Sequence, residues 1–350
     1  MVINCEEFKK KLAYLGMGTS ISTTGKLNEQ SILFDTIDGI VYGFTDNHIN
    51  NIKIEIGPTD KEFYTIVDYT LLYNFIKSCK GNITLETTNN FLQIKSDNVK
   101  CKLPTHTHIV TKQSCGINSP DNNYIYDFEL TEQIEINKLK PIINETIPIE
   151  IYRNIYFGDN IMVSDTDNVM IVKKRIFTKD IILSYSSVQL LNMLTNVKYT
   201  YITNGTRSQL AIKSDELYAT ITIIDNKDNS YQYTDLLNLF DEFNNTKRVT
   251  VNTSILAEAI NTASIFKTIP CLVFNKKGIF VTIPAVDFMY IIDNSISCDD
   301  RTILLPLDLS KKIINLGQNV ELYYNKDCLL RCDIDNINEI LSIEEMKVNV

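Results

Sequence analysis

The chain has 350 residues, 44% of them hydrophobic, and its 34 Lys and Arg are outnumbered by 43 Asp and Glu, giving a formal net charge of −9. This composition excludes a largely disordered chain, and the acidic balance excludes a protein that is basic over its whole surface. No apolar run reaches the ~18 residues of a membrane-spanning helix, and the N-terminus lacks a signal-peptide apolar region, so we expect a cytoplasmic protein with no membrane partner.

The first predicted elements are a strand at 1–3 and a helix at 5–15. Asn4 has the position and chemistry of a helix N-cap, and Glu7 completes a capping-box pattern. Two strands then flank Asp38-Gly39, a dipeptide typical of a two-residue hairpin turn.

The segment 65–103 follows as a strand, a helix, a hairpin and a third strand. Asp68 is the predicted helix cap and Gly81 the left-handed residue that ends the helix. We expect the buried face of this helix to consist of Leu71, Leu72, Phe75 and Ile76.

The same order of elements occurs twice more. Ser184 and Asp308 are the later caps, and the stop residues Gly81, Asn196 and Gly317 are separated by 115 and 121 positions (196−81 and 317−196). Similarity at a fixed spacing indicates a repeated structural unit. The sequence therefore predicts three copies of one α+β domain.

The first helix of each repeat keeps the same spacing. Thr131 is the predicted cap in the second repeat and Thr253 in the third. Each domain should contain two helices packed on two antiparallel sheets. The predicted parts are domain one at 1–110, a linker at 111–123, domain two at 124–230, a connecting segment at 231–247, and domain three at 248–350.

This triplicated order resembles the bacterial type of DNA polymerase sliding clamp, the beta-subunit family of DNA polymerase III. Residues 163–172 (VSDTDNVMIV) lie where the family has VATDGHRLAV. Residues 233–240 resemble the segment that leaves the family's second domain, and 346–348 (MKV) resemble its terminal MRL. The likeness extends over essentially the whole chain, although no single motif is specific.

The resemblance implies a homodimeric ring, of the DNA clamp fold, that encircles double-stranded DNA without sequence specificity. Such a ring tethers a replicative DNA polymerase and is opened by a clamp loader. Its helices would direct basic residues towards the phosphates. The candidates are Lys9, Lys10, Lys11, Lys77, Lys80, Lys138, Lys140, Lys198, Lys267, Lys311 and Lys312.

A second implied surface is a groove that binds short peptides of polymerases and other partners. The chain departs from the family there, with Asp167-Asn168-Val169 in place of GHR and Glu344-Glu345 in place of Met-Pro. We expect a more acidic groove with a different peptide preference, and these departures favour a phage or plasmid version. The groove residues would be Tyr152, Asp165, Thr166, Val169, Met170, Thr234, Leu239, Ile343, Met346 and Val348.

Ring closure in the family joins domain one of one chain to domain three of the other. Carried over, this places Val99 and Cys101 against Ile265 and Phe266 of a second copy. A slip of one residue in this alignment would turn the strand over.

Enzymatic chemistry has little support in the sequence. We expect no catalytic residues, no metal site and no cofactor, because the chain lacks a phosphate-binding glycine motif and its His106-x-His108 pair lacks a third ligand. The eight cysteines form no CxxC pair and should be buried free thiols. The alternative function is a repeat-built interaction scaffold that does not encircle DNA.

Overall fold

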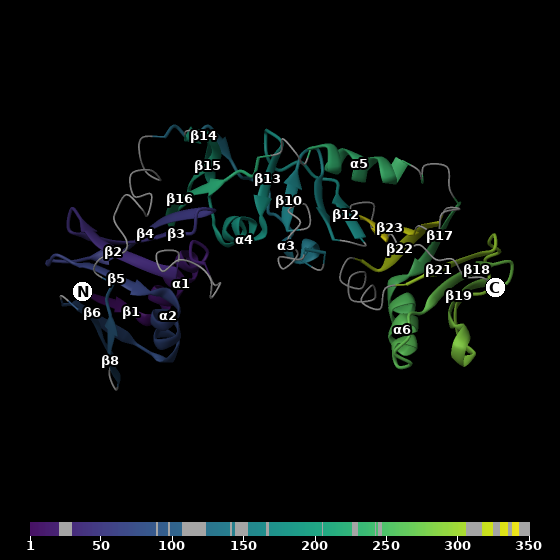
Figure 1. The fold of residues 1–350 in the computed structure, drawn as a ribbon, viewed down its shortest axis with the longest axis horizontal. Coiled ribbons are helices and arrows are strands. Elements are labelled where there is room, and N and C mark those ends of the chain that lie inside the picture. The colour runs from purple at the N-terminus through teal and green to yellow at the C-terminus, as the bar shows by residue number, and fades with distance from the viewer. Residues whose placement is uncertain are drawn as a thin grey trace. The chain divides into compact units, whose positions relative to one another are not determined.

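The structure is a computed structural model, in which the chain forms two compact units. One unit comprises 1–134 with 186–225, and the other comprises 135–185 with 226–350 (Figure 1). The residues described are 1–20, 30–88, 90–96, 99–106, 124–140, 142–143, 153–165, 168–204, 206–225, 230–241, 243, 247–305, 317–324, 330–334 and 338–342.

The first unit contains an eight-stranded antiparallel sheet in the order β5-β2-β3-β4-β16-β15-β14-β9. Its two halves come from distant parts of the sequence and meet where β4 pairs with β16. The strands are β2 (Ser31–Ile37), β3 (Ile40–Asp46), β4 (Asn50–Pro58), β5 (Tyr64–Asp68), β9 (Phe128–Glu129), β14 (Lys198–Asn204), β15 (Arg207–Lys213) and β16 (Leu217–Thr222).

A four-stranded sheet, β1-β6-β7-β8, completes the strands of this unit. Helices α1 (Cys5–Gly16) and α2 (Tyr69–Ser78) lie side by side and pack against strands of both sheets (Figure 1). The four strands are β1 (Val2–Asn4), β6 (Asn82–Thr87), β7 (Phe91–Ser96) and β8 (Val99–Pro104).

The second unit has the same two kinds of sheet. Its eight-stranded sheet runs β13-β10-β11-β12-β24-β23-β22-β17, and its four-stranded sheet runs β20-β19-β18-β21. The strands are β10 (Asn154–Phe157), β11 (Ile161–Ser164), β12 (Asn168–Val172), β13 (Ile181–Ser184), β17 (Lys247–Asn252), β18 (Cys271–Asn275), β19 (Gly278–Ile283), β20 (Phe288–Asp293), β21 (Arg301–Leu304), β22 (Asn319–Tyr324), β23 (Leu330–Ile334) and β24 (Asn338–Ser342).

The strand pairing follows one rule in each third of the chain. The first strand of a repeat pairs with its sixth, which continues through the seventh to the eighth, and the fifth strand pairs with the second, which continues to the fourth. This rule holds for β1–β8, β9–β16 and β17–β24, so the α+β class and the threefold repeat predicted from the sequence are confirmed. The exact domain boundaries stay a prediction.

Most predicted caps and turns are confirmed. The Asn4 side chain accepts the amide N–H groups of Glu6 and Glu7, and the Asp68 side chain accepts that of Leu71 at 2.8 Å. Gly81 and Asn196 have the positive φ values of 69° and 51° that suit a helix stop. Asp38 and Gly39, both at positive φ, form the predicted hairpin turn.

The cap of α6 (Thr253–Ser264) lies one residue earlier than predicted. The Asn252 side chain accepts the N–H groups of Ser254 and Ile255, whereas the Thr253 hydroxyl donates to the carbonyl of Gly317 at 2.7 Å. The asparagine therefore satisfies the first free amides, and the threonine ties the helix to the chain that precedes β22.

The helix predicted from Thr131 is wrong in its start and length. In the described residues it is the short α3 (Ile136–Leu139), which has no side-chain cap. The predicted face of α2 is also partly wrong, because Leu72 and Ile76 are buried while Leu71 is 53% exposed. The predicted helix that follows Asp308 lies outside the described residues.

The connecting segment predicted at 231–247 contains a twelve-residue helix, α5 (Ser230–Asp241). Its Tyr233 ring stacks on Tyr156 with centroids 4.7 Å apart, and Arg331 donates to the carbonyl of Phe240. The remaining helices are α4 (Tyr185–Met193) and a short 3-10 turn, η3 (Pro284–Val286).

The predicted free thiols are also present. Cys5, Cys79, Cys271, Cys298 and Cys332 are free and buried, and Cys101 is half-buried. Among the described helices, none is long and apolar enough to cross a membrane.

Candidate nucleic-acid and subunit interfaces

The three lysines of α1 each face a carboxylate. Lys9 contacts Glu6 at 2.7 Å and Lys11 contacts Glu7 at 2.5 Å, both within the helix. Their ammonium groups also donate to the backbone carbonyls of Cys79 and Ile56. The hydrogen bond to Glu6 raises the pKa of Lys9. These two lysines are therefore oriented by the protein itself, and much of their charge is compensated.

Lys10 and Lys138 show the same compensation. Lys10 lies 3.6 Å from Glu216, and Lys138 lies 2.6 Å from Glu135. The sequence placed these lysines on helices correctly, but it did not indicate how many would have an acidic neighbour. The spacing of Glu6 with Lys9 and of Glu7 with Lys11 contains that signal, because residues three or four apart meet on a helix.

Helix α2 presents a different arrangement. Tyr69 and Tyr73 stack with ring centroids 5.4 Å apart, and the Lys77 ammonium lies 4.4 Å from the Tyr73 centroid. Burial raises the pKa of Tyr69 to about 12, so this ring stays neutral at physiological pH. Lys77 is exposed and has no carboxylate partner in the described part of the chain.

The other candidate lysines are scattered over the two units. Lys80, Lys140, Lys198 and Lys267 are exposed, and each lies at or just beyond the end of a helix or at a strand start. Lys267 has a positive φ of 54° in the turn that ends α6. The predicted Lys311 and Lys312 lie outside the described residues.

Strand β8 is an open edge of its sheet, because it pairs with β7 alone. Its side chains alternate between an apolar set, formed by Val99, Cys101 and Leu103, and a basic set, formed by Lys100 and Lys102. Val99 is 41% exposed and Leu103 is buried. The edge thus presents free backbone groups flanked by one apolar and one basic row.

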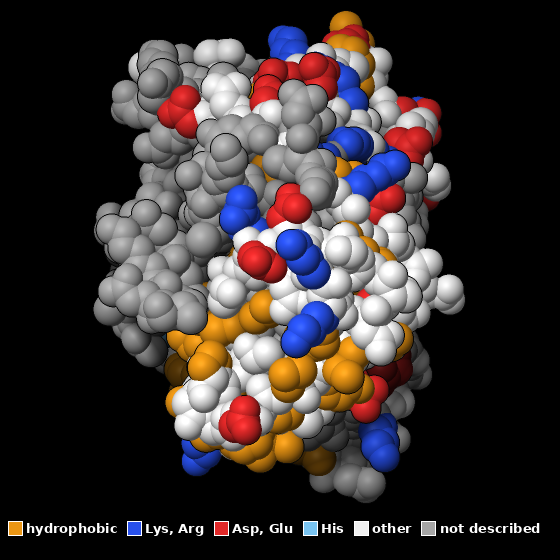
Figure 2. Space-filling model, turned by 90° about the vertical axis from the view of Figure 1, so that its right-hand side faces the viewer, with side chains coloured by type: hydrophobic (Ala, Val, Ile, Leu, Met, Phe, Trp, Pro, Cys, Tyr) orange, Lys and Arg blue, Asp and Glu red, His pale blue; other side chains and the backbone are white. Residues whose placement is uncertain are grey.

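Strand β20 is the corresponding open edge in the second unit, since it pairs with β19 alone. Met289 and Ile291 are 61% and 54% exposed. The predicted contact residues Ile265 and Phe266 are exposed nearby, and the Phe266 ring lies 5.3 Å from that of Phe288. Figure 2 shows hydrophobic side chains gathered on this side of the molecule with few charges among them.

The predicted peptide groove is described only in part. Asp165 is half-buried, while Val169 and Met170 are fully buried in β12, between β11 and β24. Thr234 and Leu239 lie on α5, and their side chains lie outside the described set. Tyr152, Thr166, Ile343, Met346 and Val348 also lie outside it. The sequence missed α5, although Tyr233, Leu237 and Phe240 have helical spacing.

No group of three or more His, Cys, Asp or Glu in the described residues is arranged to hold a metal ion. Burial raises the pKa of the thiols of Cys5 and Cys79, which opposes a role for either as a nucleophile. The prominent features of the described surface are therefore the lysines and the two open sheet edges.

Comparison with solved structures connects this architecture to one fold. The Helicobacter pylori beta clamp bound to a DNA ligase peptide matches with a TM-score of 0.72 and 14% identity, over 99% of this chain and 100% of that chain. The beta chain of DNA polymerase III from Streptococcus pneumoniae matches with a TM-score of 0.74 and 11% identity, over 99% of both chains.

A third structure, the DNA polymerase III beta subunit from Thermotoga maritima, matches with a TM-score of 0.71 and 11% identity, over 99% of both chains. Neither a protein-family model nor a curated protein sequence matches. The likeness seen in the sequence is confirmed at the level of the fold, and the chain has the fold of the bacterial beta clamps.

Proposed function

We propose that this chain is a processivity clamp, in which two copies close head to tail into a ring that encircles duplex DNA and holds a polymerase on it. The role is non-enzymatic, since the ring acts by topological linkage. The near-complete match to beta clamps supports the role in general. The ring itself is supported by the way the strands of one chain pair.

The strand pairing leaves one unmatched pair of edges, and this observation carries the proposal. Strand β4, the fourth of repeat one, pairs with β16, the eighth of repeat two, and β12 pairs in the same way with β24. The fourth strand of repeat three is β20 and the eighth of repeat one is β8, and both are open. Repeating the rule once more joins β20 of one copy to β8 of another.

The two existing junctions also suggest a register for the third. Asn50, the first residue of β4, lies opposite Ile221, the fifth residue of β16. The first residue of β12 likewise lies opposite the fifth of β24. Transferred to the open edges, this antiparallel register places Phe288 opposite Leu103, Tyr290 opposite Cys101 and Ile292 opposite Val99 of the second copy.

The side chains are compatible with this register. Residues 99, 101 and 103 would meet 292, 290 and 288, so that an apolar row faces an apolar row. Lys100 and Lys102 would lie opposite Ile291 and Met289 on the other face. Ile265 and Phe266 then flank the junction beside β20, which modifies the direct contact expected from the sequence alone.

The lysines without a carboxylate partner provide the proposed DNA contact. Lys77 and Lys80 on or beside α2, with Lys140, Lys198 and Lys267, would meet phosphates in a salt-dependent manner without reading bases. Lys9, Lys10, Lys11 and Lys138 would contribute less, because their acidic neighbours compensate them. Such weak contacts suit a ring that slides.

The partner groove is proposed at β12, Asp165 and α5, together with the C-terminal residues named from the sequence. Val169 and Met170 would support the groove from beneath, since both are fully buried. The bound H. pylori clamp carries a DNA ligase peptide, which supports peptide binding by this fold. A polymerase and a clamp loader are the proposed users of the groove.

Light scattering and DNA retention test the proposal together. The ring requires a mass of twice 40.1 kDa in solution. Clamps loaded onto nicked circular DNA should remain bound in high salt and be released when the circle is cut. A monomer at micromolar concentration, or retention unchanged by cutting, would favour the scaffold that does not encircle DNA.

A further inference from the structure

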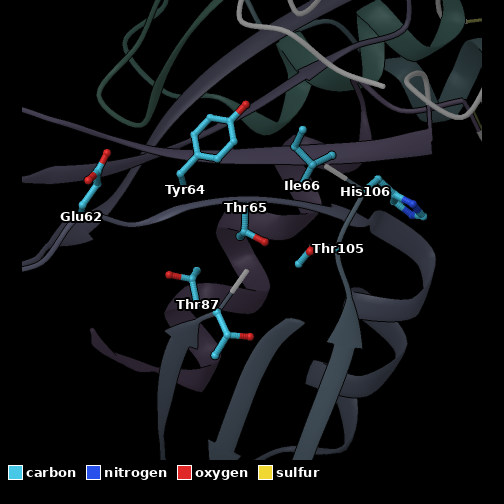
Figure 3. A pocket seen from close by; sticks show the side chains of 8 residues that line it. Glu62, Tyr64, Thr65, Ile66, Thr87, Thr105 and His106 are labelled. Atoms are coloured by element: carbon cyan, nitrogen blue, oxygen red, sulfur yellow. The ribbon is translucent and has the colours of Figure 1, made fainter. Parts of the chain in front are cut away.

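A cavity of about 310 Å³ lies in the first repeat, away from the lysines and from the surfaces proposed above. It lies between β5 on one side and the ends of β6 and β8 on the other (Figure 3). At ~30 Å³ per water molecule, this space would hold about ten waters. The volume is at the lower end of the range of small-molecule sites.

Threonines dominate the cavity wall. Thr65 comes from β5, Thr87 from the end of β6, and Thr88 and Thr105 from the adjoining chain. Figure 3 shows Thr65 on the side of β5 that faces Thr87 and Thr105, with Tyr64 and Ile66 on the opposite side. The alternation of a strand therefore directs one hydroxyl of β5 into the cavity.

Two of these hydroxyls have no hydrogen-bond partner. Thr65 is only 3% exposed, and neither its Oγ1 nor the buried Oγ1 of Thr105 contacts a donor or acceptor. Thr88 differs, because its hydroxyl donates to the carbonyl of Phe91 at 3.1 Å and accepts the amide of Phe91. A buried polar group without a partner destabilises the fold, so the two hydroxyls mark a place where a ligand would be favoured.

The backbone beside the cavity adds further polar groups. The Ile66 carbonyl accepts the amide N–H of His106 at 3.0 Å, on the edge of β5 that faces away from β2. Because backbone groups alternate in direction along a strand, those of Tyr64 point to the same open edge. The Glu62 carboxylate and the His106 imidazole lie at the rim.

The chemistry of the wall limits the class of ligand. No lysine or arginine lines the cavity, so nothing there compensates a phosphate or a carboxylate. The two unpartnered groups are hydroxyls, each able both to donate and to accept. A neutral molecule with several hydroxyl groups matches them, whereas a compact cation would leave the donors unused.

We propose that this cavity binds a small neutral polyol of about the size of one sugar ring, held by the hydroxyls of Thr65 and Thr105. Thr105 directly follows β8, and its amide donates to the Asn90 carbonyl at 3.0 Å. An occupied site would therefore also order the end of β8. The inference is independent of ring formation, since all the residues belong to one repeat.

Saturation-transfer NMR on the full chain tests the site, with ribose, glucose and glycerol as probes and with inorganic phosphate and putrescine as charged controls. A neutral polyol should give signal with a dissociation constant near 1 mM, and the charged probes should not compete. Thr65→Val should weaken binding about three- to tenfold, the effect of one lost hydrogen bond. Valine keeps the β-branched shape, so the strand is retained.

Thr220→Val is the matched control, because Thr220 is a buried strand threonine that does not line the cavity. It should leave polyol binding unchanged. Amide exchange provides a second readout, since a bound polyol should slow exchange at Thr105 and His106. Absence of polyol binding, equal binding by Thr65→Val, competition by phosphate, or unchanged exchange at these two amides would each overturn the inference.

Discussion

The junctions already closed within the chain differ in character from the two edges left open. Strand β4, which pairs on both sides, is buried along most of its length and keeps even Lys53 at 7% exposure. Open strand β8 has the same place relative to its own sheet as β16, yet Val99, Lys100 and Lys102 are exposed. Strand β20 is likewise apolar but exposed at Met289 and Ile291.

This difference indicates which junctions are permanent. A strand buried on both faces has no alternative to its partner, whereas an exposed edge with lysines is soluble alone and pairs only with a complementary edge. The junction of β4 with β16 is further fixed by Asn50, which is fully buried, accepts from Ser187 at 2.7 Å and donates to the Met17 carbonyl at 2.9 Å. Four predictions test this contrast.

Removing the buried amide should have the largest effect. Asn50→Ala leaves the Ser187 hydroxyl and the Met17 carbonyl without their partner, so we expect a loss of about 2–4 kcal/mol in unfolding free energy. Urea denaturation measures this loss. Asn74→Ala, at an exposed position of α2, is the control and should change stability by less than ~0.5 kcal/mol. A similar small loss for Asn50→Ala would show that the junction does not depend on this network.

A new cysteine should trap the proposed open-edge pairing. In the transferred register Cys101 lies opposite Tyr290 of the second copy, at the separation of directly opposed side chains, so Tyr290→Cys should form an intermolecular disulfide on mild oxidation. Non-reducing electrophoresis would show a dimer that disappears when Cys101→Ser is added. A dimer that persists in this double variant would contradict the register.

Charge at the outer face of the same edge should have a smaller effect. Ile291→Lys would place a second ammonium opposite Lys100, whereas Ile291→Glu would place a carboxylate there. Cross-strand pairs contribute about 0.2–1 kcal/mol, so the two variants should differ by up to about fivefold in the dissociation constant of the dimer. Sedimentation equilibrium measures the constant, and adding Lys100→Glu to Ile291→Lys should restore it. Equal constants for the two variants would exclude Lys100 from the junction.

The smallest expected effect concerns the lysines. Lys77→Gln removes a charge that faces no carboxylate, and Lys9→Gln removes one that contacts Glu6. Titration of a short duplex at several salt concentrations should show a salt slope lower by about 1 for Lys77→Gln. Lys9→Gln should change the slope less. The reverse order would mean that the ion pairs of α1 open when DNA binds.

The elements that the sequence predicted best are those fixed by local chemistry. Asn4, Asp68 and Gly81 act through hydrogen bonds or φ values that involve only residues nearby in the chain. Predictions that depended on distant contacts were less accurate. The helix expected from Thr131 begins only at Ile136, and Leu71 is exposed because α2 buries a narrower face than its apolar residues suggested.

The sequence by itself determined the repeat, since the caps, stops and hairpins return at nearly constant spacing and each is a local signal. It also indicated the fold class that the comparison with solved structures confirms. Only the tertiary structure decided which strand edges are joined and which stay open, because β4 meets β16 and β12 meets β24 across long stretches of chain. Pairing of this kind is set by the fit of whole sheets, and no local pattern along the chain specifies it.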